Sequence, residues 1–418
     1  MDLRVATAPD LLDTAVTVLD LVRGGVANTR PEITRLSGLG RNVVTQRVAQ
    51  LLDSGLLAEG KLGPSTGGRA PRELRFRSDA GHILVAELGA TSISVAISDL
   101  VGRLIGQLTE TCDIAEGPEP VLGRVAELFD DLLRTHPLDV WGVGIGLPGP
   151  VEFTTGRPVA PPIMPGWDGF DVRGYFSLRH DAPTWVDNDV NVMVLGELRD
   201  GLARGRDDVI YVKVGSGIGA GLVSGGKLHR GAQGCAGDIG HIAVQRTSRI
   251  VCRCGQTGCL EALAGGSALA RHGQLAAQSG ESRFLAKIEQ TGQPITAADV
   301  GRAALHGDPY SVGLVTRSAQ LVGESLSRLV NFFNPSLILI GGGVSEVGDL
   351  YLATVRQMIF SRSLPLATRS LLIERSPLGD TAGLKGAAFM VIDELLSRQR
   401  LGLWIDQGSP AGQPALSA

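Results

Sequence analysis

One pattern occurs twice along this chain: a buried strand, a glycine-rich turn, a second strand, a short turn and a third strand. The first copy begins at Ile83 and contains the turn Gly89-Ala90-Thr91. The second begins at Asp208 and contains the turn Gly215-Ser216-Gly217. A duplicated pattern of this kind predicts two similar α/β lobes with a cleft between them.

The glycine turns are candidate ligand-binding loops. Glycine allows a backbone amide to approach a phosphate closely, so such turns can hold one. A third turn, Gly341-Gly342-Gly343, follows the apolar run 337–340 and could admit a nucleotide base or ribose. Glycine turns also occur in purely structural hairpins, so the turns alone leave both interpretations open.

Between the two copies, an apolar strand at 185–187 leads into Asn188-Asp189 at the start of a predicted helix. A carboxylate at a strand end that faces a cleft can accept a hydroxyl proton during phosphoryl transfer, and the amide of Asn188 can orient that hydroxyl. Either residue can equally act as the N-cap of a helix that runs through Glu197. This stretch alone does not separate the two roles.

Four soft metal ligands lie within nineteen residues, namely His241, Cys252, Cys254 and Cys259. Thiolates bind zinc at about 2.3 Å, and the short spacing with interspersed glycines lets one loop place three sulfurs around an ion. Four protein ligands leave no position for water, so the pattern predicts a structural zinc site. The alternative is three buried cysteines and an unrelated histidine.

The composition is that of a globular chain of 418 residues, 43% hydrophobic and 20% charged. Only Cys112 and Cys235 remain outside the cluster, so we expect no disulfide framework and a reducing, cytoplasmic location. The first residues lack the pattern of a signal peptide, and no apolar run reaches transmembrane length, so no membrane association is expected.

The N-terminal segment differs in charge from the rest. Residues 30–77 carry nine Lys or Arg and four acids, whereas the whole chain has a net charge of −4.

Apolar residues at helical spacing predict helices over about 8–23, 29–37 and 41–52, with a turn at 37–40. The third helix presents residues suited to a DNA major groove: Arg41, Asn42, Thr45, Gln46 and Arg47. The alternative is an ordinary solvated helix face.

A hairpin with a basic, glycine-rich tip follows over 59–77, and its Arg69 and Arg72 are candidates for phosphate or minor-groove contacts. We therefore predict a winged helix-turn-helix DNA-binding domain over 1–79. A protein-binding role for the same fold stays open, since fold does not determine function.

Taken together, these motifs resemble the ROK family of repressors and sugar kinases, whose body has the duplicated actin/hexokinase-like (ribonuclease H-like) fold. The most specific element runs from Gly237-Asp238-Ile239-Gly240-His241 to Glu261 and is similar to the family's zinc signature. The resemblance implies zinc ligation by the histidine and three cysteines named above. It implies sugar contacts from Asn188, Asp189, His241 and Glu261, with Asp189 as the catalytic base in members that are kinases, and Asp238 near the sugar.

Departures from the kinase pattern occur near the sugar, where Asp238 replaces the usual glutamate and Ile163 a common asparagine, and in the phosphate motif. Family kinases carry Asp-x-Gly-Gly-Thr-Lys, whereas this chain has Glu87-Leu88-Gly89-Ala90-Thr91-Ser92. The longer carboxylate, the added β-carbon and the missing lysine weaken the expected site for ATP and Mg²⁺, so ATP turnover is not expected.

The predicted protein is therefore a DNA-binding regulator, most simply a repressor of carbohydrate metabolism, that senses a sugar or sugar phosphate. Its expected partner is palindromic operator DNA, read by a homodimer or homotetramer. The expected domains are 1–79, a first lobe over 80–200, a second lobe with the zinc site over 201–398, and a flexible tail over 399–418. An ATP-dependent sugar kinase with an accessory winged domain is the alternative, and a protein-binding scaffold is a third.

Overall fold

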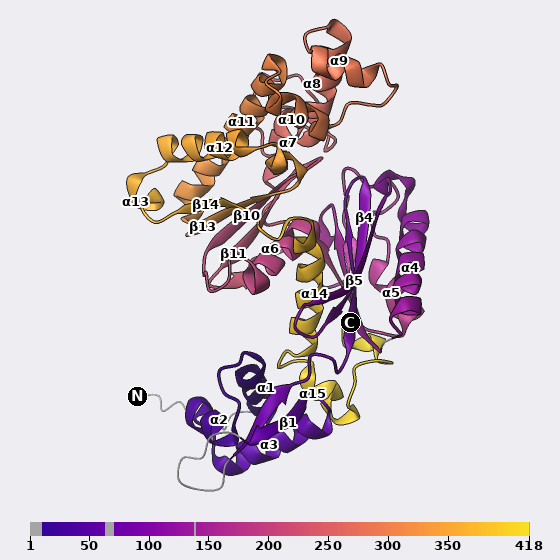
Figure 1. Cartoon of the computed structure of the whole chain (residues 1–418), viewed down its shortest axis with the longest axis vertical. Helices are drawn as coiled ribbons and strands as arrows, with labels where there is room; N and C mark the ends of the chain where they lie inside the picture. The colour runs from indigo at the N-terminus through magenta and orange to yellow at the C-terminus, as the bar shows by residue number, and fades with distance from the viewer. Residues whose placement is uncertain (1–10, 63–70, 138, 418) are drawn as a thin grey trace.

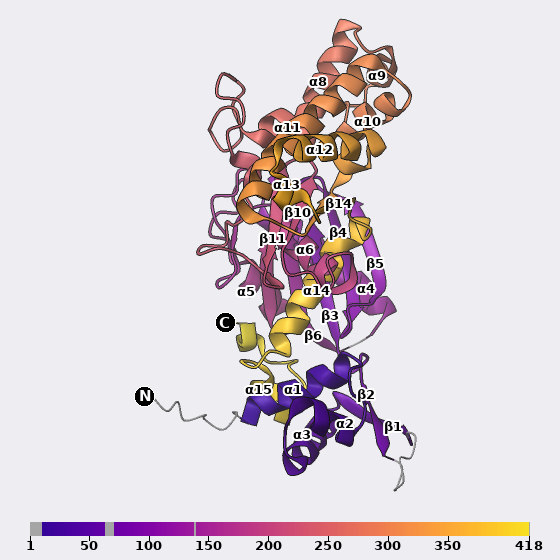
Figure 2. The same cartoon turned by 90° about the vertical axis from the view of Figure 1, so that its left-hand side faces the viewer.

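The computed structural model describes residues 11–62, 71–137 and 139–417. An N-terminal domain lies at one end of an elongated molecule, the first lobe lies in the middle and the second lobe at the far end (Figure 1). In the turned view of Figure 2, the C-terminal segment lies beside the N-terminal domain. Within the described residues, no helix combines the length and apolarity needed to cross a membrane.

The N-terminal domain contains three helices and a hairpin: α1 (Leu11–Arg23), α2 (Arg30–Ser37), α3 (Arg41–Asp53), β1 (Leu57–Leu62) and β2 (Arg72–Phe76). Helix α2 begins with the capping box that its sequence predicts, because Thr29 accepts from the Glu32 amide and Glu32 accepts from the Thr29 amide. Ile33, Val44 and Leu51 are fully buried between the helices. This arrangement agrees with the expected winged helix-turn-helix; the wing tip with Arg69 lies outside the described residues.

The first lobe is built on a five-stranded sheet in the order β5-β4-β3-β6-β9. Strand β3 pairs antiparallel with β4 and parallel with β6. Both faces are covered, so side chains of both parities along β3 are buried. The strands and outer helices are β3 (His82–Leu88), β4 (Ser92–Asp99), β5 (Leu104–Thr111), β6 (Val140–Leu147), β9 (Thr184–Asn188), α4 (Pro118–Thr135) and α5 (Val172–His180), with the small pair β7 (Val151–Glu152) and β8 (Arg157–Pro158) beside them.

The second lobe repeats the same sheet in the order β12-β11-β10-β13-β14. Strand β10 pairs antiparallel with β11 and parallel with β13, which matches the pairing of β3. The predicted duplication is thus confirmed. The elements are β10 (Val209–Val214), β11 (Ile218–Ser224), β12 (Lys227–Leu228), β13 (Leu337–Gly341), β14 (Leu372–Arg375), α7 (Leu260–Ala264), α8 (Gly266–Ser279), α9 (Arg283–Glu289), α10 (Ala297–Leu305), α11 (Pro309–Phe333), α12 (Asp349–Arg362) and α13 (Pro365–Thr368).

Two helices cross between the lobes, and they correct the expected boundary at residue 200. Helix α6 (Asp189–Asp200) packs on β10 and β11 of the second lobe, whereas α14 (Ala382–Leu395) packs on β3 and β6 of the first. The two helices touch where each carries a glycine: a β-carbon at Gly386 would lie 1.5 Å from the Val192 carbonyl oxygen, and one at Gly196 would lie 2.3 Å from that of Ala382. Each lobe therefore contributes one helix that packs on the sheet of the other lobe.

The C-terminal segment is folded, which corrects the expectation of a flexible tail over 399–418. Helix α15 (Leu401–Trp404) and two 3-10 turns (Ile405–Gln407 and Pro414–Ser417) follow α14. Trp404 is fully buried, donates its indole N–H to the Leu395 carbonyl at 3.0 Å, and packs edge-on against Trp141. The abundance of Gly, Pro, Ser and Ala suggested fraying, but a few large apolar side chains anchor the segment.

One hydrophobic cluster joins these parts. Leu19 of the N-terminal domain, Val85 of β3, Val391 of α14 and Trp404 all belong to it. The N-terminal domain and the first lobe therefore share a continuous core, so we expect them to move together.

Candidate functional site

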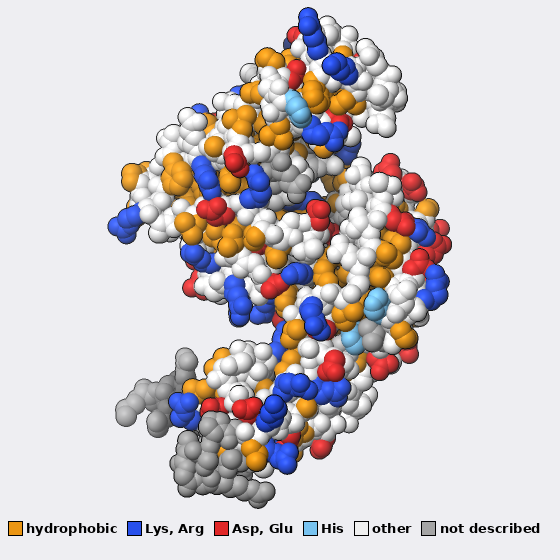
Figure 3. Space-filling view, in the orientation of Figure 1, with side chains coloured by type: hydrophobic (Ala, Val, Ile, Leu, Met, Phe, Trp, Pro, Cys, Tyr) orange, Lys and Arg blue, Asp and Glu red, His pale blue; other side chains and the backbone are white. Residues whose placement is uncertain are grey.

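A cleft of about 920 Å³ lies between the lobes, where the surface in Figure 3 is hollowed. The glycine turns of both copies line it, as does the turn Gly341-Gly342-Gly343. The five residues predicted to contact a sugar line the same cleft: Asn188, Asp189, Asp238, His241 and Glu261. Positions more than seventy residues apart in sequence are thus brought to one site.

The predicted metal ligands also meet. The ligand atoms of His241, Cys252, Cys254 and Cys259 all lie within 4.8 Å of one another. The Cys254 and Cys259 sulfurs are 3.7 Å apart, and His241 Nδ1 lies 3.5 Å from the Cys252 sulfur. Tetrahedral bonds of about 2.3 Å place sulfur atoms about 3.8 Å apart, so the spacing fits a zinc ion.

Burial favours the protonated form of the cluster thiols when no ion is bound. Burial raises the pKa of Cys259 to about 12, and contacts with Cys254 and Cys252 add to the shift. Burial likewise raises the pKa of Cys252. A bound dication reverses this preference, because a coordinated thiol loses its proton. With all four donors used, such an ion would have a structural role.

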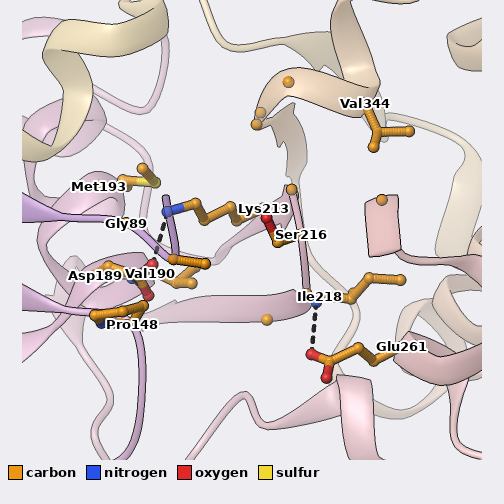
Figure 4. Close-up of a pocket in the computed structure, with 18 of the residues that line it drawn as sticks. Gly89, Pro148, Asp189, Val190, Met193, Lys213, Ser216, Ile218, Glu261 and Val344 are labelled. Atoms are coloured by element: carbon orange, nitrogen blue, oxygen red, sulfur yellow. Dashed lines mark hydrogen bonds and ion pairs between the residues drawn. The ribbon is translucent and has the colours of Figure 1, made fainter. Parts of the chain in front are cut away.

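The two nitrogens of the His241 ring face different groups. Nδ1 points to the sulfur cluster, whereas Nε2 lies 4.0 Å from Asp238 Oδ1 on the cleft side. The metal cluster and the cleft therefore share one imidazole. Glu261 lies in the first turn of α7, two residues after Cys259, and its carboxylate accepts from the Ile218 amide at 3.1 Å (Figure 4).

Asn188 and Asp189 lie at the N-terminus of α6, where the structure shows the capping role, and both side chains line the cleft; the role in proton transfer stays a prediction. Asn188 is the N-cap, accepting from the Val190 amide at 3.0 Å, while its own amide donates to the Gly149 carbonyl at 2.9 Å. Asp189 lines the cleft but is only 5% exposed. Helix capping thus fixes the orientation of both cleft residues.

Lys213 is a cleft residue that sequence reasoning missed. Its ammonium lies 2.7 Å from Asp189 Oδ2 (Figure 4). It also lies 3.7 Å from Glu87 Oε1. Burial raises the pKa of Glu87 to about 7, although Lys213 opposes this shift. Burial lowers the pKa of Lys213, but Asp189 and Glu87 outweigh it and the net shift is upward. A lysine inside the otherwise apolar strand 209–214 was the available signal.

Arg230 is a second residue that the sequence did not single out. Its guanidinium lies over the Phe153 ring at 3.8 Å and donates to Asp187 at 2.7 Å. Asp187 is 1% exposed and also accepts from Asn191, so it ties the loop after β12 to the start of α6. This network holds the cleft wall beside Asn188.

On α3, the structure separates the candidate DNA contacts. Four are exposed on the helix surface: Arg41, Asn42, Thr45 and Gln46. Arg47 is only 7% exposed, so the prediction that it faces the DNA groove is wrong. It lies between Val44 and Leu51 on the buried side of the helix. It donates to Gln50, which donates to Asp406 of the C-terminal segment.

On the hairpin, Arg72 is exposed and lies 3.5 Å from Glu59. Arg30 pairs with the same glutamate at 3.1 Å. These are surface ion pairs of little energetic weight, so Arg72 stays available to a phosphate. Figure 3 shows Lys and Arg side chains spread over this end of the molecule.

The chain is similar to proteins of two activities. It is 32% identical to the xylose repressor of Caldicellulosiruptor bescii over 373 residues, covering 88% of this chain and 92% of the relative. It is 31% identical to a glucokinase of Halalkalibacterium halodurans over 318 residues, covering 75% of this chain and 96% of the relative.

A solved structure has the same fold throughout. A ROK family transcriptional regulator, a homolog of the E. coli Mlc protein, superposes with a TM-score of 0.81 at 24% identity, covering 95% of this chain and 99% of the other. Residues 84–394 match the ROK family itself. This chain therefore belongs to the ROK family.

Proposed function

We propose that this protein is a sugar-responsive transcriptional repressor. Its N-terminal domain would bind operator DNA, and the cleft between the lobes would bind the sugar that changes operator affinity. The observation that carries the proposal is the fusion, in one chain, of a helix-turn-helix with an exposed polar α3 face and a cleft lined by the residues expected for a sugar site.

The extent of similarity supports this choice. An alignment that covers 88% of this chain has to extend into the N-terminal domain, whereas one that covers 75% does not. The relative similar over the longer span is named a repressor, and the relative similar over the shorter span is named a glucokinase. The longer similarity thus extends into the domain that would read DNA.

The structure offers a route from the cleft to the DNA-binding domain. A β-carbon at Gly383, in the first turn of α14, would lie 2.0 Å from Glu87 Oε2, so this helix begins directly against a cleft carboxylate. Near its other end, Asp393 lies 3.9 Å from Arg23 of α1. A ligand that favours one arrangement of the lobes would bias α14 and the domain attached to it.

Zinc would have a supporting role in this proposal. Four protein ligands would hold the ion in place and fix the His241 ring, leaving Nε2 on the cleft side. Cys259 would position Glu261 in the same way. The ion supplies rigidity when bound, and the cleft side chains recognise the sugar.

We further propose a cytoplasmic homodimer or homotetramer that reads a palindromic operator. A helix-turn-helix protein gains affinity when two copies bind two half-sites about one helical turn apart. Coupling of about 1 to 3 kcal/mol between sugar and DNA would change operator affinity by about 5- to 150-fold.

Fluorescence anisotropy with the DNA upstream of the protein's own gene tests the proposal. Specific binding should weaken steeply with salt and change at least fivefold on addition of one sugar from a panel that includes D-xylose and D-glucose. Gln46→Ala, on the exposed α3 face, should cost about 1 to 3 kcal/mol of specific binding. The matched control Gln278→Ala, on α8, should not change binding. Absence of specific binding to this DNA, with or without sugars, would refute the proposal.

A sugar kinase is the second candidate, favoured by the presence of Asn188, Asp189 and Glu261 in the cleft and by the similarity to a glucokinase. A coupled assay of ADP release over the same sugar panel decides this, with Asp189→Ala as the control. Turnover that Asp189→Ala abolishes would place the kinase first.

A further inference from the structure

Lys213 projects from the second lobe into a pair of carboxylates at the base of the cleft. Strand β10 ends one residue later, at the turn Gly215-Ser216-Gly217. The ammonium contacts Asp189 at 2.7 Å and lies 3.7 Å from Glu87, which belongs to β3 of the first lobe. The exposed fraction of the side chain is 19% for Lys213, 7% for Asp189 and 11% for Glu87, so water screens these charges poorly.

Each carboxylate would be costly without this cation. An unpaired buried carboxylate is strongly disfavoured, and two that face each other disfavour one another further. Asp189 already uses Oδ1 to accept from the Val190 amide, and Oδ2 accepts from Lys213. Lys213 therefore takes the position, between two carboxylates, that a divalent cation takes in sites that bind phosphate groups.

The rest of the cleft is unfavourable for an anionic ligand. Among the described residues that line it, five carry carboxylates and two are cationic, Lys213 and Arg375. The lining carboxylates are Glu87, Asp189, Asp238, Glu261 and Asp380. A nucleotide triphosphate or a sugar phosphate would add negative charge to this surface, whereas the hydroxyls of an uncharged sugar suit carboxylate acceptors.

We propose that Lys213 is a specificity-determining residue of the cleft: its ammonium takes the place of a divalent cation between Glu87 and Asp189, so the cleft binds an uncharged sugar without metal or nucleotide there. A lysine ammonium has three N–H donors; one is hydrogen-bonded to Asp189, and Glu87 lies at ion-pair distance. A further N–H donor would meet a sugar hydroxyl. The inference rests on the proposed function, because it concerns the sugar site of that repressor.

Titration calorimetry with the zinc-loaded, full-length protein tests the ligand class. Three ligands are compared: D-xylose, D-glucose and D-glucose 6-phosphate. Each is titrated under three conditions, namely without additions, with Mg²⁺ alone, and with Mg²⁺ plus a non-hydrolysable ATP analogue. We expect a free sugar to bind with a Kd that these additions change less than twofold, and the phosphate to bind at least tenfold more weakly. A sugar that binds only with Mg²⁺ and the nucleotide analogue, or a preference for the phosphate, would overturn the inference.

Three variants test Lys213 itself. Lys213→Met should weaken sugar binding at least tenfold, and Lys213→Arg, which keeps the charge, should weaken it less. The double variant E87Q/K213M should bind more tightly than Lys213→Met, because it removes the facing charge. Lys227→Met, at an exposed lysine of β12, is the matched control and should bind like the wild type. Wild-type binding by Lys213→Met would contradict the proposed role.

Urea unfolding without sugar keeps the test independent of the proposed function. We expect a lower midpoint for Lys213→Met than for the wild type and a partial recovery in E87Q/K213M. Equal midpoints for all three proteins would overturn the role of Lys213 as a counter-ion. Failure of every sugar to bind the wild type, with this midpoint order intact, would instead count against the proposed function.

Discussion

The attachment of the C-terminal segment leads to a quantitative prediction for Trp404→Ala. Trp404 is fully buried, packs edge-on against Trp141 with ring centroids 5.3 Å apart, and donates to the Leu395 carbonyl. A buried tryptophan removes about 200 Å² from water, worth about 5 kcal/mol at about 25 cal/mol per Å². The methyl of alanine keeps part of this, and measured Trp-to-Ala changes cost about 3 to 5 kcal/mol. We therefore expect a loss of about 4 kcal/mol.

Urea unfolding followed by far-ultraviolet circular dichroism measures this loss. The matched control is Leu403→Ala, one residue away on α15, because Leu403 is 60% exposed. Its expected cost is below about 0.5 kcal/mol, as for other surface changes. A cost below about 1 kcal/mol for Trp404→Ala, or equal costs for both variants, would refute the view that Trp404 anchors the C-terminal segment.

Two further predictions concern the cleft and the metal cluster. Cys254→Ser should lose bound zinc, measured by metal analysis, together with the sugar response of operator binding. The matched control Cys112→Ser, at a half-buried cysteine outside the cluster and outside the cleft lining, should keep both. An intact sugar response without zinc would contradict the supporting role of the metal. Because burial raises the pKa of Glu87 to about 7, the native carboxyl keeps a proton that the unfolded chain has released, so stability should fall as pH rises from about 4.5 to 7. The decline in the free energy of unfolding should be at most about 3 kcal/mol, and Glu87→Gln should remove it in urea unfolding. An unchanged slope of stability against pH in this variant would argue against a buried Glu87.

The local elements were predictable because short-range physics determines them. The duplicated strands follow from the alternation of apolar residues, and the capping box at Thr29 follows from hydrogen-bonding geometry. The candidate metal ligands follow from the spacing of soft ligands. All of these signals are visible over a few residues. The resemblance to the ROK family then implied which side chains would meet in the cleft.

The errors arose where contacts between distant segments decide the outcome. Arg47 was assigned to a groove-facing surface because its residue type suits DNA, but the helix period places it on the buried side, next to Gln50 and the C-terminal segment. The last twenty residues looked flexible by composition, since the pocket that accepts Trp404 is formed by residues far away in the chain.

Local patterns and the family signature in the sequence predicted the two similar lobes, the histidine and cysteine cluster and most of the cleft residues. Two features emerge only in the folded chain: α6 and α14 each pack on the sheet of the opposite lobe, and Lys213 lies between Glu87 and Asp189. Residues 87, 189 and 213 come from three separate elements, so their mutual charge compensation exists only once both lobes have folded around the same cleft.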